Sequence, residues 1–211
     1  MDNKYSKYFY ESERVGGKAV QVIKEECIDI FLKTLAQDVT VEPRFRCLFS
    51  ILFSGGLRIS EALSLKKSDI TENPDGYLVG KVKVLKKGNL KNTKRKNKEV
   101  YRDFIVHPIF KPLFVKLLAS RKPSERLFDR RSNYKARIVA QKVTRKIAYD
   151  NVIKTFGEEL DCHSFRHSNL SFMLSKNQTQ LVIAQTLKLE LSTVVRYVHV
   201  RADLKMADLF S

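Results

Sequence analysis

Hydrophobic residues recur at helical spacing over most of the chain. Apolar residues stand four apart from Ile23 through Cys27 to Leu35, which predicts a first helix. Pro43 suits the first turn of a second helix that runs through Phe53. The period continues after two glycines, over residues 59–63, so three helices are expected before residue 66.

The period changes between residues 77 and 106. Two runs rich in β-branched residues, 78–85 and 100–106, flank a polar stretch that contains Gly and Asn. This pattern predicts a small antiparallel hairpin with a long tip. Helical spacing then returns at Leu113 and Leu117, over 138–147, at Phe165 and Phe172, and in a last helix that Ser192 could cap. The expected fold class is mainly α with a small antiparallel β-sheet (α+β).

The chain is expected to form one substantial domain. Residues 1–18 are polar and rich in Tyr and Lys, and we interpret them as an N-terminal arm or linker remnant. The domain itself is expected over residues 19–200, with a C-terminal tail at 201–211. No repeat with a period of 20 to 50 residues is evident.

The charge balance favours a polyanionic partner. The 40 Lys and Arg residues exceed the 23 Asp and Glu residues and give a formal net charge of +17, which points to nucleic acid. A membrane is not expected, because the longest apolar stretch, 47–53, is too short to span one. The N-terminus lacks the apolar core of a secretory signal, which predicts a cytoplasmic protein. The three cysteines are interpreted as buried thiols, and neither a metal nor a cofactor is implied.

Two tracts without any acidic residue concentrate the positive charge. They lie at residues 86–98 and 130–146, and each alone could be a solvated face. Together they fit a positively lined groove around a DNA duplex better. The basic residues expected to bind DNA are Lys86, Lys91, Lys94, Arg95, Lys96, Arg137, Lys142 and Arg145.

One set of residues meets the needs of metal-independent cleavage of a DNA phosphodiester. That reaction requires a nucleophile, cations fixed on the non-bridging oxygens and an acid for the leaving oxygen. Arg58 precedes Glu61 by nearly one helical turn, so the carboxylate can hold the guanidinium. His163 and Arg166 stand three apart on one helical face, and Tyr197 follows in a short predicted helix.

The order of these residues resembles the signature of the tyrosine recombinase (phage integrase) family. Its motifs read roughly GLRisEl, KGn, HxLRHt and LGHxxxxxTxxxY, and the resemblance covers about residues 20–200. It implies the catalytic-domain fold of that family and site-specific cleavage and rejoining of DNA through a 3′-phosphotyrosyl intermediate. It also implies that Tyr197 is the nucleophile and that Arg58 and Arg166 clamp the scissile phosphate, which suits the planar fork of Arg.

The resemblance assigns the remaining roles as well. Lys87 matches the hairpin lysine that protonates the leaving oxygen, and the long tip leaves three alternatives for that role, Lys86, Lys91 and Lys94. His163 matches the histidine that orients or deprotonates the tyrosine. His167 matches a histidine that packs against the catalytic residues without taking part in the reaction. Glu61 has a similar supporting role.

Lys188 departs from the family pattern. Counting back nine residues from Tyr197 places Lys188 where the family has its second histidine. An ammonium can donate to a phosphate oxygen, so Lys188 is a candidate catalytic residue. Alternatively, it faces solvent or a neighbouring phosphate.

The resemblance also implies partners. They are double-stranded DNA and a homotetramer on the DNA synapse, with weakly associated or monomeric protein in its absence. The tail at 201–211 could dock on a neighbouring subunit. Two alternatives remain open: strand relaxation of the type IB topoisomerase kind, and a catalytically impaired DNA-binding accessory protein of the same fold.

Overall fold

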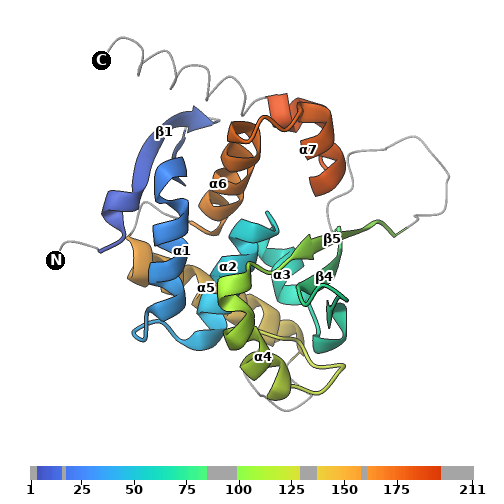
Figure 1. Cartoon of the computed structure of the whole chain (residues 1–211). Coiled ribbons are helices and arrows are strands. Elements are labelled where there is room, and N and C mark those ends of the chain that lie inside the picture. The colour runs from blue at the N-terminus through green and yellow to red at the C-terminus, as the bar shows by residue number, and fades with distance from the viewer. Residues whose placement is uncertain (1–3, 16–17, 85–98, 129–136, 158–160, 196–211) are drawn as a thin grey trace, which may run out of the picture.

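The computed structural model describes residues 4–15, 18–84, 99–128, 137–157 and 161–195 (Figure 1). Its elements, with short 3-10 turns labelled η, are η1 (Ser6–Tyr8), β1 (Phe9–Val15), β2 (Lys18–Ile23), η2 (Glu25–Cys27), α1 (Ile28–Gln37), α2 (Pro43–Ser54), α3 (Ile59–Ser64), η3 (Lys67–Asp69), β3 (Ile70–Glu72), β4 (Leu78–Lys83), β5 (Tyr101–Ile105), η4 (Pro108–Phe110), α4 (Lys111–Ala119), α5 (Arg137–Phe156), α6 (Cys162–Ser175) and α7 (Gln180–Leu187).

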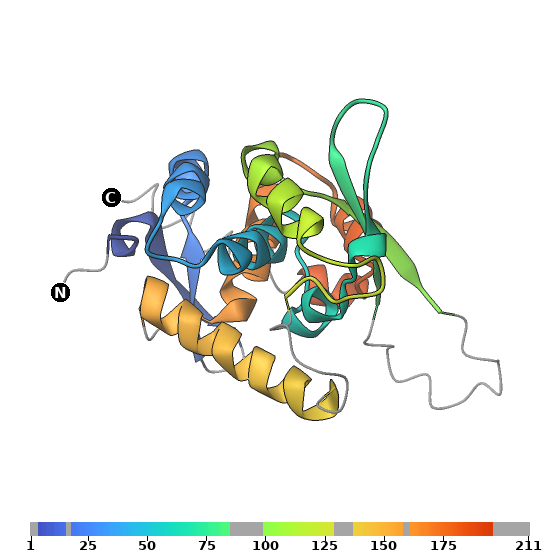
Figure 2. The ribbon, with the colours of Figure 1, turned by 90° about the horizontal axis from the view of Figure 1, so that it is seen from below.

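The described residues confirm the expected fold class. Helices dominate, and β4 pairs with β5 in the antiparallel hairpin that the sequence predicts, from Val79 opposite Ile105 to Lys83 opposite Tyr101. The sequence pattern missed β3, which adds a third antiparallel strand to the other edge of β4. It also missed the separate antiparallel pair of β1 and β2. Figure 2 shows the two sets of strands at opposite ends of the molecule, with helices between them.

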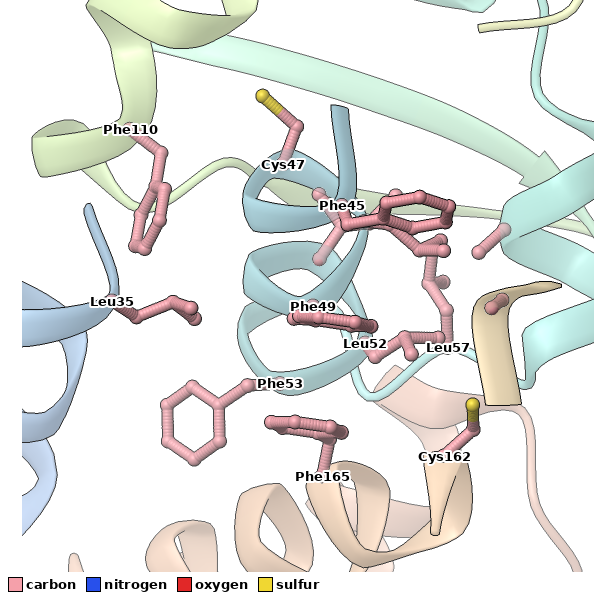
Figure 3. Close-up of a cluster of buried hydrophobic side chains, with 14 of the residues drawn as sticks. Leu35, Phe45, Cys47, Phe49, Leu52, Phe53, Leu57, Phe110, Cys162 and Phe165 are labelled. Atoms are coloured by element: carbon pink, nitrogen blue, oxygen red, sulfur yellow. The ribbon is translucent and has the colours of Figure 1, made fainter. Parts of the chain in front are cut away.

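Helix α2 is the centre of the core. Pro43 occupies its first turn as predicted, and every residue from Arg44 to Phe53 is buried. A helix that is buried all round needs neighbours on every side, and α1, α3, α4 and α6 all contact α2. The ring of Phe49 on α2 stacks on Phe165 of α6 with centroids 5.6 Å apart (Figure 3). This stack joins α6 to the centre of the fold.

The first helix begins later than the sequence pattern predicts. Ile23 is the last residue of β2, where it pairs with Phe9, and Cys27 ends η2, so α1 starts only at Ile28. The backbone N–H of Ile23 donates to Oγ of Ser168 on α6 at 2.9 Å. Apolar residues four apart are compatible both with a helix and with a strand followed by a turn. The hydrogen bonds that β2 makes with β1 and α6 favour the strand.

The N-terminal segment is packed rather than free of the domain. We expected an arm or linker remnant at 1–18, but Tyr5, Tyr8 and Phe9 are buried. The ring of Tyr5 lies 4.8 Å from that of Phe156 on α5, centroid to centroid, and its hydroxyl donates to Asp38 at 2.7 Å. The polar composition of the segment concealed these aromatic anchors.

Two of the three cysteines match their expected placement. Cys47 and Cys162 are buried thiols, and Cys27 is half-buried. Burial raises the pKa of both buried thiols to about 12, so they stay protonated at neutral pH. Among the helices described, none combines the length and the apolar character that a membrane crossing needs.

Replacing Tyr5 with Ala should lower the free energy of unfolding by about 3–5 kcal/mol, the usual loss when a buried aromatic ring is removed. Tyr5→Phe keeps the ring and should cost only about 1 kcal/mol for the lost hydrogen bond. Urea unfolding measures both. Tyr77→Ala, at a tyrosine that is 45% exposed, is the control and should change little. Wild-type stability in Tyr5→Ala would mean that residues 4–9 do not belong to the core.

Candidate active site

A glycine turn joins α2 to α3 and begins the site. Gly56 has a φ of +53°, in the left-handed region that favours glycine. A Cβ on Gly56 would also lie 2.7 Å from Oδ1 of Asn169 on α6. Both constraints require glycine here. Arg58 follows as the N-cap of α3, and its backbone N–H donates to Oε2 of Glu61 at 2.9 Å.

The carboxylate of Glu61 is fully buried and lies among three guanidinium groups. Its Oε1 is 3.0 Å from Nη1 of Arg58, the contact that the sequence spacing predicts. Its Oε2 is 3.4 Å from Nη2 of Arg102 and 3.8 Å from Nη1 of Arg166. Burial opposes ionisation of Glu61. The backbone N–H of Arg58 and the charges of the three arginines outweigh that burial and hold the pKa of Glu61 below its ordinary value.

Arg166 reaches this cluster from α6. The helix starts after Asp161, whose carboxylate caps it by accepting from the backbone N–H groups of His163 at 2.6 Å and Ser164 at 3.0 Å. Arg166 lies in the following turn and donates from Nη1 to the carbonyl of Gly56 at 2.6 Å. The fold therefore brings the two candidate clamp arginines, which are distant in sequence, to one turn and one carboxylate.

Arg102 is a member of the cluster that the sequence did not indicate. It lies on β5 and donates to the carbonyls of Gly55 at 2.7 Å and Gly56 at 3.1 Å. Burial lowers the pKa of Arg102 and the charge of Glu61 opposes that shift. The signal that could have found it is the two-residue spacing from Phe104, because alternate residues of a strand lie on the same face and both face inward in β5.

The cluster carries an excess of positive charge. Three guanidinium groups and one carboxylate sum to 3 − 1 = +2. The side chain of Arg58 is 23% exposed, whereas those of Arg102 and Arg166 are 2% and 8% exposed. Arg58 thus presents this charge to solvent, and the arrangement can bind an anion such as a phosphate.

The two histidines of α6 differ in environment. His163 is exposed in the first turn, and within the described residues its imidazole makes no hydrogen bond. Its ring centroid lies 6.5 Å from that of His167. Burial, with smaller contributions from the charges of His163 and Arg166, lowers the pKa of His167 to about 4. His167 is therefore neutral at pH 7.

Lys188 is the C-cap of α7. It is exposed, and its backbone is left-handed, with φ 49° and ψ 53°. The preceding residue, Leu187, packs so closely on Gly56 that a Cβ there would lie 3.3 Å from Cδ2 of Leu187. Among the described residues the ammonium of Lys188 has no hydrogen-bond or ion-pair partner.

The last described helix spans residues 191–195. Ser192 does not cap it as expected, because the helix already includes Leu191, and the backbone N–H of Thr193 donates to the carbonyl of Glu190 at 2.9 Å. Val194 is fully buried in a second apolar cluster with Leu170 of α6 and residues of α7. This packing anchors the helix three residues before the candidate nucleophile.

The structure describes only some of the other candidate residues. Arg145 is described and exposed on α5, with its guanidinium 5.7 Å from the ring centre of Tyr149. The side chains of Arg137 and Lys142 on the same helix are not among those described. The candidates that lie outside the described residues are Tyr197, Lys86, Lys87, Lys91, Lys94, Arg95 and Lys96.

Comparison with known sequences gives consistent matches. The sequence model of the phage integrase family matches residues 21–203. The tyrosine recombinase XerC of Staphylococcus aureus (strain JH9) is 26% identical over 191 residues, which cover 85% of this chain and 57% of XerC. XerC of Staphylococcus saprophyticus is 29% identical over 182 residues, covering 83% and 56%. The chain spans a little over half the length of these relatives.

Comparison with solved structures supports the fold. The XerH site-specific recombinase, bound to its palindromic difH substrate in a post-cleavage complex, superposes with a TM-score of 0.63 at 22% identity, covering 89% of this chain and 52% of XerH. The Tn1549 transposon integrase in complex with transposon right end DNA gives 0.57 at 16% identity, covering 90% and 66%. At these identities the likeness establishes the fold alone.

Replacing Glu61 with Gln should lower the free energy of unfolding by about 3–5 kcal/mol at pH 7, because buried arginines lose their counter-ion. The pKa of Glu61 is depressed in the folded protein. Its stabilisation is therefore present above the unfolded value of about 4.3 and is lost as the pH falls through the folded pKa. The difference between wild type and Glu61→Gln should shrink in acid, as urea unfolding over a pH series measures.

Glu72→Gln is the control for this experiment, since Glu72 pairs with Lys111 at the surface and is 51% exposed. It should lower the free energy of unfolding by less than about 1 kcal/mol at any pH. If Glu61→Gln were no more harmful than Glu72→Gln, the buried carboxylate would not hold the cluster together.

Two substitutions of Lys188 separate the effect of its backbone conformation from that of its side chain. A left-handed conformation costs a non-glycine residue about 1–2 kcal/mol, so Lys188→Gly should unfold at a higher urea concentration than Lys188→Ala. Urea unfolding of the two variants measures this order. Equal midpoints would mean that position 188 is not left-handed in solution. If the order holds, Lys188→Gly removes the ammonium and leaves the backbone unstrained.

Proposed function

Because the chain belongs to the phage integrase family, we propose that it is the catalytic part of a site-specific recombinase. In the proposed reaction Tyr197 attacks a DNA phosphate and forms a 3′-phosphotyrosyl link, so that a DNA strand is cut and later rejoined. The observation that carries the proposal is the buried Glu61 carboxylate, which joins Arg58 and Arg166 in one positively charged cluster.

The cluster supplies what transfer of a phosphoryl group needs most. Negative charge develops on the non-bridging oxygens as the phosphate becomes five-coordinate, and donors fixed in advance stabilise that charge without reorganising. Arg58 and Arg166 would donate to these oxygens through their planar forks. Glu61 and the carbonyl of Gly56 hold the guanidinium groups in place before DNA arrives.

The remaining steps are assigned to residues around this clamp. The phenol oxygen of Tyr197 would form a bond to phosphorus while the bond to the 5′-oxygen breaks, and Lys87 would give that oxygen its proton. Lys86, Lys91 and Lys94 are alternatives for the acid. His163 would take the proton of the phenol, and its exposed place in the first turn of α6 leaves its imidazole accessible. The 5′-hydroxyl of a partner strand then reverses the step.

Lys188 would serve as an additional donor to the phosphate. The preceding residue, Leu187, packs on the glycine turn of the clamp. The exposed side chain of Lys188 would turn toward the scissile phosphate so that its ammonium donates to a phosphate oxygen. His167 would support the site without carrying charge, because it is neutral at pH 7.

The proposed partner is double-stranded DNA. The net charge of +17 and the acid-free tracts at 86–98 and 130–146 support it. We extend the proposal to a homotetramer on the DNA synapse, with residues 201–211 docking on a neighbouring subunit. The proposed location of the reaction is the cytoplasm. The catalytic domain is taken as residues 19–200, with the preceding segment packed against it through Tyr5, Tyr8 and Phe9.

The test is covalent attachment to a nicked suicide duplex built from the DNA that flanks the gene. Wild type should become linked to DNA, whereas Tyr197→Phe should form no adduct and should bind the duplex within a few fold of wild type, because only one oxygen is lost. Denaturing gels measure the adduct and mobility shift measures binding. An adduct with Tyr197→Phe would assign the nucleophile to another residue, such as Tyr101 or Tyr149.

The adduct assay, run beside a supercoiled plasmid that carries the same DNA, separates the proposed function from its rivals. Adduct with strand exchange supports recombination, adduct with relaxation of supercoiled DNA alone would indicate topoisomerase activity, and the absence of adduct would indicate a DNA-binding accessory protein.

Arg58→Ala should lower single-turnover cleavage by about 10²-fold or more, as expected when a fixed donor is lost. Lys116→Ala, at an exposed lysine of α4 that is not a candidate site residue, is the control for a change of charge alone.

A further inference from the structure

The sheet contributes one buried cation to the site. Arg102 projects from β5, opposite Val82 of β4, and its side chain is 2% exposed. Its two terminal nitrogens reach three oxygens of the turn and of α3: the carbonyls of Gly55 and Gly56, and Oε2 of Glu61. A single side chain thus spans from the sheet to the turn that holds the clamp.

Stability alone is a weak reason for this arrangement. The neighbouring inward position of β5 holds Phe104, an apolar residue of the core. Burying a guanidinium costs solvation, and a buried ion pair can often be replaced by apolar residues without loss of stability. An arginine at this position therefore suggests a task that an apolar side chain could not perform.

That task is apparent from which atoms Arg102 shares with the clamp. The carbonyl of Gly56 accepts from both Arg102 and Arg166. The carboxylate of Glu61 faces the guanidinium of Arg58 with one oxygen and those of Arg102 and Arg166 with the other. Moving the turn or the carboxylate would therefore displace both guanidinium groups that are proposed to bind the phosphate.

We propose that Arg102 is a positioning residue for the phosphate clamp: it fixes the Gly55–Gly56 turn and the Glu61 carboxylate so that Arg58 and Arg166 meet the scissile phosphate in the correct geometry. This inference rests on the proposed function. Arg102 itself does not touch the phosphate, because its terminal nitrogens are directed at protein oxygens and its side chain is almost fully buried.

Two substitutions separate the parts of this role. Arg102→Lys keeps a positive charge near Glu61, but one ammonium lacks the planar fork that reaches both glycine carbonyls. Arg102→Met keeps a similar length and loses the charge and the donors. Arg44→Met is the matched control, since Arg44 is also a buried arginine that pairs with a carboxylate, Glu42, but it lies at the opposite end of α2.

The main measurement is single-turnover cleavage of a suicide duplex, at a temperature where each variant is folded. With an ordinary scissile phosphate, Arg102→Met should cleave about 10²-fold more slowly than wild type, as for loss of a fixed donor, with Arg102→Lys in between. Arg44→Met should stay within a few fold. A rate for Arg102→Met that equals that of Arg44→Met would overturn the proposal.

A methylphosphonate at the scissile position distinguishes positioning of the clamp from a general structural role of Arg102. It removes the negative charge that the clamp neutralises, so a misplaced clamp matters less. The defect of Arg102→Met relative to wild type should therefore shrink to below about tenfold on this substrate, because the donors lost are those that stabilise charge. A defect of unchanged size on both substrates would mean that Arg102 acts elsewhere than through the clamp.

Hydrogen exchange tests the positioning without any reaction. The backbone amides of residues 55–62 should exchange faster in Arg102→Met than in Arg44→Met, because the turn loses its anchor on the sheet. If wild type forms no adduct with DNA, the proposed function fails, and this exchange pattern still decides the role of Arg102. Unchanged protection of residues 55–62 in Arg102→Met would overturn it.

Discussion

The buried carboxylate of Glu61 is the interaction on which the site depends. It has no contact with solvent, and its two oxygens face guanidinium groups from three separate elements, α3, β5 and α6. An ionised carboxylate in the interior needs such partners, and the arginines in turn need a counter-ion. The same ion cluster therefore fixes the arrangement of the sheet, the glycine turn and α6, and it leaves an excess of positive charge where Arg58 reaches solvent.

The rest of the fold serves to bring these elements together. α2 lies at the centre and is buried all round, which fixes the glycine turn at its C-terminal end. Phe165 directly precedes Arg166 on α6, and its stack on Phe49 holds this part of α6 against α2 (Figure 3). Asp161 caps the same helix, so that His163 and Arg166 occupy successive turns. Packing that is apolar in origin thus sets the geometry of a polar site.

Much of this could be predicted from the sequence, and the failures have physical causes. Pro43, the helical period and the Arg58–Glu61 spacing are local signals, and the structure contains the elements and the contact they predict. Ile23 and Tyr5 were misplaced because strand pairing with Phe9 and burial against Phe156 are long-range. Arg102 was missed because an arginine in a predicted hairpin is ordinarily expected to face solvent or DNA, although it alternates in register with the inward-facing Phe104.

The central claim is that the arginines are held in place before DNA arrives, and nitrogen-15 NMR of the arginine side chains in the free protein tests it most directly. The account predicts that the guanidinium groups of Arg102 and Arg166 rotate slowly and are protected from exchange with water, and that both properties are lost in Glu61→Gln. Fast rotation and fast exchange of all arginine side chains in the wild-type protein would contradict it, because the cluster would then form only on DNA.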